Sequence, residues 1–180
     1  QLVEGQTKEV QFSFDTNHGT DDYLKIIEGK TASLIKTSAK LGAMASGCKQ
    51  ETISSISKWA WHSGIIFQIT DDILDLSSDE KTLGKPSGND IIEGTYTLPV
   101  LIALEKYPEK INKILSDVSE NKVGVNEVIN EFNNDEIISE SKLFLKTHLE
   151  KSESAAKEID NKTVRNILLD INTYLIERSN

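Results

Sequence analysis

Residues 59–76 combine an apolar helical pattern with three aspartates that fall on one side of the helix. An α-helix turns by about 100° per residue, so the polar residues in the C-terminal half of this segment lie within an arc of roughly 100°. These residues are Gln68, Asp71, Asp72 and Asp75. Isoleucine, leucine and phenylalanine fill the other faces, which is typical of a buried helix. We therefore expect a fold that buries this helix and turns its carboxylates toward a polar cavity or toward cations.

The crowding of these aspartates favours a metal site. Neighbouring carboxylates raise one another's pKa unless a cation lies between them. Mg²⁺ takes oxygen ligands and prefers one or two carboxylates together with substrate phosphates. The pattern therefore predicts a Mg²⁺ site at Asp71, Asp72 and Asp75, with an ordinary acidic patch at a helix end as the alternative. A calcium-binding EF-hand loop is excluded, because the segment lacks alternating ligands and a central glycine.

The rest of the chain also follows a helical pattern. Only three prolines occur among its 180 residues, and β-branched residues do not alternate with polar ones. Apolar residues recur at helical spacing instead, so we expect an all-α fold that forms a single domain over residues 1–180. The segment from Ser78 to Thr95 is expected to be a loop. The predicted helices span residues 1–13, 21–46, 50–77, 96–106, 108–120, 124–133, 136–160 and 163–178.

Lys30 lies in the middle of an apolar stripe on the predicted helix 21–46, with Thr31 at its edge. The members of this stripe are Ile26, Ile27, Leu34 and Leu41. A lysine on the core side of a helix either extends its ammonium group to the surface or meets a fixed negative partner. Because an acidic helix suited to metal binding is present in the same chain, we favour an anionic ligand for Lys30.

A second lysine occurs in the predicted loop after the aspartates. Lys85 lies ten residues after Asp75 and is flanked by Gly84 and Gly88. Glycines let a backbone approach a phosphate closely, and a lysine supplies a point charge. We therefore expect Lys85 to return over the metal site.

Charge and composition narrow the partners of the chain. The net charge of −9 leaves no basic surface to displace counterions from nucleic acid. No apolar run approaches the roughly 20 residues that a membrane helix needs. Cys48 is the only cysteine, which excludes an internal disulfide and favours a reducing, cytoplasmic location. The three histidines, His18, His62 and His148, are scattered along the sequence and are interpreted as structural or exposed.

Several elements together resemble the trans-isoprenyl (polyprenyl) diphosphate synthases. Residues 64–75, followed by 83–90 and 94–99, are similar to the second aspartate-rich motif of that family and its downstream lysine loop. Lys30-Thr31 matches the family's lysine–threonine pair. This order and spacing is far more specific than a DDxxD motif alone. The match to the family is close up to about residue 105 and looser beyond. Within the family, the chain resembles the long-chain synthases, such as the heptaprenyl type.

The resemblance implies a bundle of mostly antiparallel helices around a central cavity, of which this chain is the C-terminal portion without the N-terminal helices. It implies a Mg²⁺-dependent enzyme that extends an allylic prenyl diphosphate with isopentenyl diphosphate in trans configuration, by ionisation, condensation and elimination. Asp71 and Asp75 would hold Mg²⁺ with support from Asp72. Catalysis would depend on Asp71, Lys30 and Gln68, and the substrate-binding residues would be Lys30, Thr31, Gln68 and Lys85.

Some parts of the family pattern are missing or altered. Nothing in the chain matches the family's first aspartate-rich motif or its basic isopentenyl diphosphate site, so the other cavity wall would come from a longer polypeptide or from a second subunit, in a homodimer or heteromer. Gly5–Glu9 holds glutamine and glutamate in the reverse of the usual long-chain order and is given no role.

Two interpretations stay open for Trp61 and Gly64, which either shape the cavity or simply pack. The alternatives are a terpene cyclase, which fits the lysine loop less well, and a non-catalytic helical subunit that binds prenyl diphosphates or a partner synthase.

Overall fold

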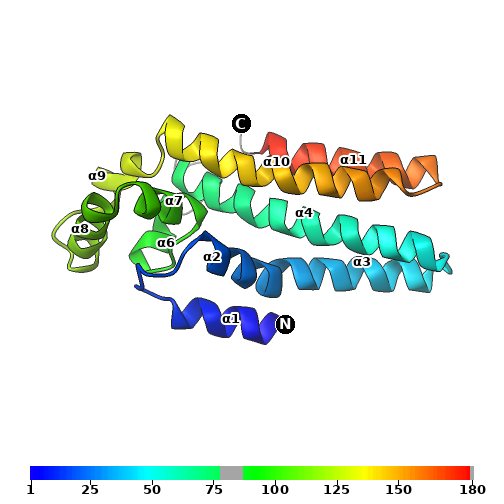
Figure 1. Ribbon diagram of the computed structural model, residues 1–180, viewed down its shortest axis with the longest axis horizontal. Coiled ribbons are helices and arrows are strands. Elements are labelled where there is room, and N and C mark those ends of the chain that lie inside the picture. The colour runs from blue at the N-terminus through cyan, green and yellow to red at the C-terminus, as the bar shows by residue number, and fades with distance from the viewer. Residues whose placement is uncertain (78–86, 179–180) are drawn as a thin grey trace.

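The computed structural model describes residues 1–77 and 87–178, and every regular element in these two ranges is a helix (Figure 1). The predicted all-α fold is therefore confirmed. None of the described helices has the length and apolarity needed to cross a membrane.

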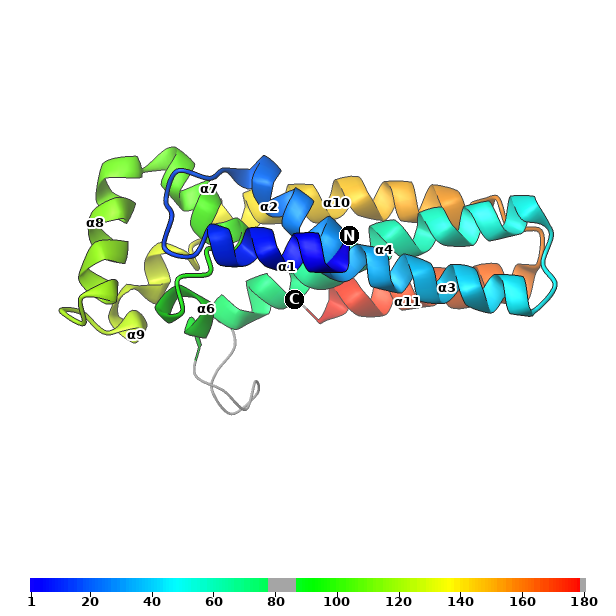
Figure 2. The same cartoon turned by 90° about the horizontal axis from the view of Figure 1, so that it is seen from below.

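Four long helices lie side by side and form an elongated bundle, seen in two perpendicular views in Figures 1 and 2. They are α3 (Ser33–Ala45), α4 (Gln50–Ser77), α10 (Asp135–Lys157) and α11 (Lys162–Glu177). Helix α4 contacts the other three, and its isoleucines at positions 65, 66 and 69 are fully buried. The aspartate-bearing helix is thus the central element of the bundle, as its apolar pattern predicts.

Shorter helices complete the fold. Helix α1 (Leu2–Gln11) lies against α2 (Thr20–Ile27) and the π-helix η1 (Glu28–Ala32) along one side of the bundle. The remaining short elements gather at one end of the molecule in Figure 1. They are α6 (Asn89–Ile92), α7 (Leu98–Lys106), α8 (Pro108–Ser119), α9 (Val125–Val128) and the 3₁₀ turn η2 (Ile129–Glu131).

The predicted loop from Ser78 to Thr95 is wrong in its C-terminal part, where Asn89–Ile92 forms one helical turn. Four residues are too few to show a helical pattern in a sequence. Gly88 precedes this turn with a positive φ of 71°, a conformation that glycine adopts without a steric penalty. Its N–H donates to the carbonyl oxygen of Asp75 at 3.0 Å, which ties the turn to the end of α4.

The predicted helix 21–46 is divided by the π-helix, and this breaks the apolar stripe. A π-helical turn adds a residue to the helical repeat and rotates the segment that follows it. Ile26 and Ile27 are 6% and 4% exposed, whereas Leu34 and Leu41 are 56% and 58% exposed. The prediction of one stripe along a single face is therefore wrong beyond the π-helix.

The histidines are not all isolated in space. Nδ1 of His62 on α4 lies 3.1 Å from Nδ1 of His148 on α10, and the two ring centroids are 5.2 Å apart. The interpretation of these two residues as scattered is therefore wrong, because the packing of α4 on α10 brings them together.

Candidate active site

A cavity of about 360 Å³ lies between the N-terminal helices, α4 and the segment from Asp90 to Thr97. Four of the residues predicted to be functional line it: Lys30, Gln68, Asp71 and Asp72. Glu9, Tyr23 and Asp90 also line it, although no pattern in the sequence indicates a role for these three residues. The cavity is thus formed by segments that are far apart in the sequence.

Lys30 is held by Glu9, a residue for which the sequence pattern indicated no role. Nζ of Lys30 donates to both carboxylate oxygens of Glu9, at 2.7 and 2.8 Å. Helix α1 reaches this position because Gly5 lets two backbones meet: a Cβ at Gly5 would lie 2.5 Å from the amide nitrogen of Lys30. Lys30 therefore faces the cavity with its charge partly neutralised and its position defined.

The second polar group at the site is a chain of four side chains, of which Tyr23, Gln68 and Asp72 line the cavity and Thr31 does not. The hydroxyl of Thr31 donates to Oε1 of Gln68 at 2.8 Å, and Nε2 of Gln68 donates to Oδ1 of Asp72 at 2.9 Å. The hydroxyl of Tyr23 donates to Oδ2 of Asp72 at 2.6 Å. Asp72 is therefore the common acceptor of groups from two different helices, α2 and α4.

Burial gives Asp72 unusual acid–base properties. Desolvation raises the pKa of its carboxyl from 3.8 to about 7, although the hydrogen bonds from Tyr23 and Gln68 oppose this change. The negative charges of Asp90 and Asp71 also contribute to this rise of the pKa. The pKa of Tyr23 is raised well above 10, first by its burial and then by the adjacent Asp72, so its hydroxyl stays protonated.

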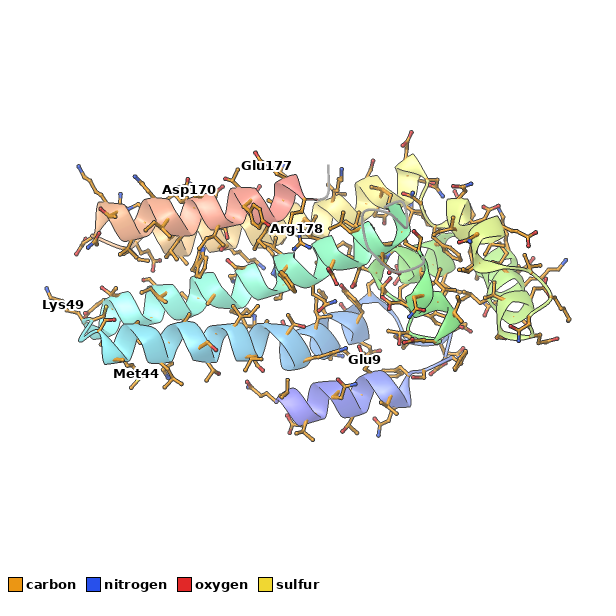
Figure 3. The ribbon with its side chains drawn as sticks, turned by 180° about the vertical axis from the view of Figure 1, so that it is seen from behind. Glu9, Met44, Lys49, Asp170, Glu177 and Arg178 are labelled. Carbon is orange, nitrogen blue, oxygen red and sulfur yellow. The ribbon has the colours of Figure 1, made fainter. Side chains whose placement is uncertain are left out.

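The other two aspartates differ from Asp72 in their surroundings. The side chain of Asp71 is 49% exposed, and its Oδ1 lies 3.8 Å from Nη2 of Arg178, near the end of α11 (Figure 3). The Arg178 guanidinium also lies over the ring of Phe67, 5.7 Å from its centroid. Asp75 is buried and is not among the described residues that line the cavity. Lys85, the fourth predicted substrate-binding residue, lies outside the described residues.

The donor set fits Mg²⁺ held jointly with a substrate. Within residues 1–77 and 87–178, no three histidine, cysteine, aspartate or glutamate side chains gather as a ready metal cage. Asp71 and Asp72 both line the cavity, however, and Mg²⁺ usually binds to one or two carboxylates while phosphate and water oxygens complete its shell. A cation shared with a diphosphate is therefore compatible with these side chains.

The architecture places the chain in the class of all-helical prenyl synthase folds. A crystal structure of heptaprenyl diphosphate synthase from Staphylococcus aureus matches it with a TM-score of 0.89 and 30% identity, over 99% of this chain and 57% of that one. A geranylgeranyl pyrophosphate synthetase from Pyrococcus horikoshii matches with a TM-score of 0.83 and 32% identity, over 98% of this chain and 54% of that one.

Residues 1–133 match the polyprenyl synthetase family, and the chain belongs to that family. Component 2 of heptaprenyl diphosphate synthase from Geobacillus stearothermophilus is 31% identical over 180 residues, which cover 99% of this chain and 56% of the relative. A prenyl transferase from Synechocystis sp. is 41% identical over 107 residues, or 59% of this chain and 33% of the relative. The resemblance noted in the sequence is thus confirmed, and the chain spans between a third and little more than half of these two relatives.

Proposed function

We propose that this chain is the diphosphate-ionising part of a Mg²⁺-dependent trans-polyprenyl diphosphate synthase. The observation that carries the proposal is the convergence of Lys30, Gln68 and the aspartates at positions 71 and 72 on one cavity. The substrates would be an allylic prenyl diphosphate and isopentenyl diphosphate, which supplies the five-carbon units.

Each side chain has a role that suits its surroundings. Lys30 and Lys85 would bind the allylic diphosphate, and Thr31 would support that site through its hydrogen bond to Gln68. Asp71 and Asp75 would hold Mg²⁺ with support from Asp72. When bound, Mg²⁺ would neutralise the negative charge that grows on the departing diphosphate.

Gln68 would lie beside the reacting allylic carbons. Its carbonyl oxygen carries a partial negative charge, which suits a developing allylic cation. The double bond of isopentenyl diphosphate would then attack the allylic cation, and loss of a proton from the product would complete the five-carbon extension.

The remaining wall of the cavity would come from elsewhere. We infer that it lies upstream in a longer polypeptide, or in a second subunit of a homodimer or heteromer. The relative from G. stearothermophilus is named as component 2 of its synthase, which supports the heteromeric arrangement. We also propose a cytoplasmic location.

The test is a turnover assay with Mg²⁺, farnesyl diphosphate and labelled isopentenyl diphosphate, followed by sizing of the prenyl products. Asp71→Ala should lower the rate on the order of 100-fold or more, because a carboxylate that holds the cation is removed. Asp170→Ala is a matched control, since Asp170 is an exposed acid on α11 (Figure 3). An unchanged rate in Asp71→Ala would refute its assigned role.

If the chain alone shows no turnover, the assay is repeated with the upstream segment of the protein or with a second component restored. Continued inactivity of that preparation, combined with binding of prenyl diphosphates, would indicate a non-catalytic subunit instead.

A further inference from the structure

The hydroxyl of Tyr23 has no part in the chemistry proposed above, although it lies at the centre of the site. Tyr23 is 4% exposed and belongs to α2, whereas its acceptor Asp72 belongs to α4. This contact spans 49 residues of sequence and is 2.6 Å long. A buried polar group in such a place needs a reason, because packing alone would be served equally well by phenylalanine.

The geometry of Asp72 shows what the hydroxyl does there. An ionised carboxylate only accepts hydrogen bonds, so a donor must face each of its oxygens. Tyr23 faces Oδ2 and the amide nitrogen of Gln68 faces Oδ1. With Oδ2 held by the phenol, the carboxylate is not free to rotate, and Oδ1 stays directed at Gln68.

The orientation of Gln68 follows from this contact. Its amide would otherwise be free to turn over, because its oxygen and nitrogen ends have the same shape. With Nε2 bound to Asp72, Oε1 is placed on the side of Thr31, whose hydroxyl proton it receives at 2.8 Å. While Asp72 is ionised, a reversed amide would set Oε1 against Oδ1 of Asp72, with no proton between two acceptors.

We infer that Tyr23 is a positioning residue, which holds Asp72 so that the amide of Gln68 keeps one orientation at the wall of the cavity. Removal of the phenol hydroxyl frees the carboxylate to rotate, and Gln68 and Thr31 then lose their common alignment. The benefit of this alignment for turnover depends on the proposed function, whereas the alignment itself does not.

Tyr23→Phe tests the inference, because it keeps the ring and its packing and removes only the hydroxyl. In the active protein, kcat should fall about 10- to 100-fold, with the KM for the allylic diphosphate nearly unchanged, since misorientation affects the reacting centre more than binding. Tyr107→Phe is the matched control. Tyr107 donates to a carboxylate oxygen of Glu136 at the same 2.6 Å, but on the surface, so its kcat should equal that of the wild type.

A double-mutant cycle separates positioning from a general structural role. If Tyr23 acts through Gln68, then Tyr23→Phe should cost less than about twofold in a Gln68→Ala background, because coupled residues are not additive. Losses that multiply fully in the double variant would overturn the inference.

A readout that needs no turnover completes the test. In the ¹⁵N-labelled chain, the side-chain amide protons of Gln68, assigned with Gln68→Leu, should exchange with water about fivefold faster or more in Tyr23→Phe, because their acceptor is no longer fixed. Tyr107→Phe should leave this exchange rate unchanged. An unchanged rate in Tyr23→Phe would overturn the inference, whereas absence of turnover in the wild type with its missing wall restored would count against the proposed function alone.

Discussion

At the scale of single residues, Asp72 combines a position at the wall of the candidate site with an electrostatic cost. Its pKa of about 7 lies above its ordinary value of 3.8, so between these values the folded state holds a proton that the unfolded state has lost. Stability therefore falls as the pH rises from about 4 to 7 and stays low above that range. A buried carboxylate that lowers the stability of the fold is typical of a functional site, where the needs of function conflict with those of stability.

Asp72→Asn should relieve this cost. The amide has the same shape and carries no charge; its oxygen can accept from Nε2 of Gln68, and its nitrogen can donate to the hydroxyl oxygen of Tyr23. We expect the free energy of unfolding at pH 8 to rise by roughly 1–3 kcal/mol, and to change little near pH 3.5, where the aspartate is mostly protonated in both states.

Thermal unfolding followed by circular dichroism at the two pH values measures this difference. Turnover of the active protein should fall at the same time, because an amide is a weaker metal ligand than a carboxylate. If Asp72→Asn had a lower Tm than the wild type at pH 8, the buried carboxylate of Asp72 would not be destabilising.

The Lys30–Glu9 pair leads to a second prediction at this scale. Lys30→Ala removes the cation and leaves the carboxylate of Glu9, whose side chain is only 19% exposed, facing the cavity without its partner. Binding of inorganic diphosphate in the presence of Mg²⁺ should weaken about 10-fold or more, because a charged donor is lost and a repulsive charge remains. Isothermal titration calorimetry measures this affinity.

The double variant Glu9→Ala/Lys30→Ala is the control for this prediction. It also lacks the cation but leaves no unpaired carboxylate of Glu9 facing the cavity, so it should bind diphosphate better than Lys30→Ala alone. Equal affinities in the two variants would show that Glu9 does not influence the anion site.

At the scale of helices, the site depends on close contacts between backbones. The π-helix that carries Lys30 and Thr31 packs directly on α4 at Gly64, where an added Cβ would lie 2.7 Å from Cα of Ala32. Gly64 therefore serves the packing of these helices rather than leaving room for a ligand, which decides between the two interpretations of its sequence position.

Gly64→Ala should force α4 and the π-helix apart. We expect a loss of about 1–3 kcal/mol in the free energy of unfolding, the usual cost of overpacking. Gly42→Ala is the control, because Gly42 lies within α3 with nothing within 4 Å of an added Cβ. This second change should raise stability by about 0.5–1 kcal/mol through the higher helix propensity of alanine.

Urea unfolding of both variants measures these changes with opposite expected signs. If Gly64→Ala proved as stable as the wild type, the close contact between α4 and the π-helix would not be a constraint on the fold.

At the scale of the whole molecule, acid should loosen the contact between α4 and α10. The pKa of His148 is lowered from 6.5 to about 4, first by burial and then by the positive charges of His62 and Lys151. The pKa of His62 is also lowered, first by burial and then by Lys151. The unfolded state therefore binds more protons than the folded state between pH 6.5 and 4, and stability falls as the pH falls through this range.

His148→Gln should weaken this dependence on pH. The difference in Tm between wild type and variant should shift in favour of the variant as the pH is lowered from 7.5 to about 4.5, because glutamine does not titrate. Asp72 contributes a slope of opposite sign, but it is present in both proteins and cancels in the difference. If the Tm difference did not depend on pH, the protonation of His148 would not contribute to the loss of stability in acid.

The sequence predicted the helical elements well where they are long. Helix α4 spans the predicted residues 50–77, and the aspartate face with Gln68 was located from periodicity alone. The short turn Asn89–Ile92 and the π-helix were not predicted, because neither is long enough to impose a repeat on the sequence. Glu9 was missed because its partner Lys30 lies 21 residues away.

The features that follow from the amino-acid sequence alone are therefore local: the all-helical fold, the buried character of α4, and the acidic and basic side chains available to the candidate site. Which of these side chains come into contact depends on the packing of the helices. Tyr23 contacts Asp72 although 49 residues separate them in the sequence, and His62 contacts His148 at a separation of 86 residues. The physical reason is that the helical repeat depends on neighbours a few residues apart, whereas these contacts depend on how whole helices pack.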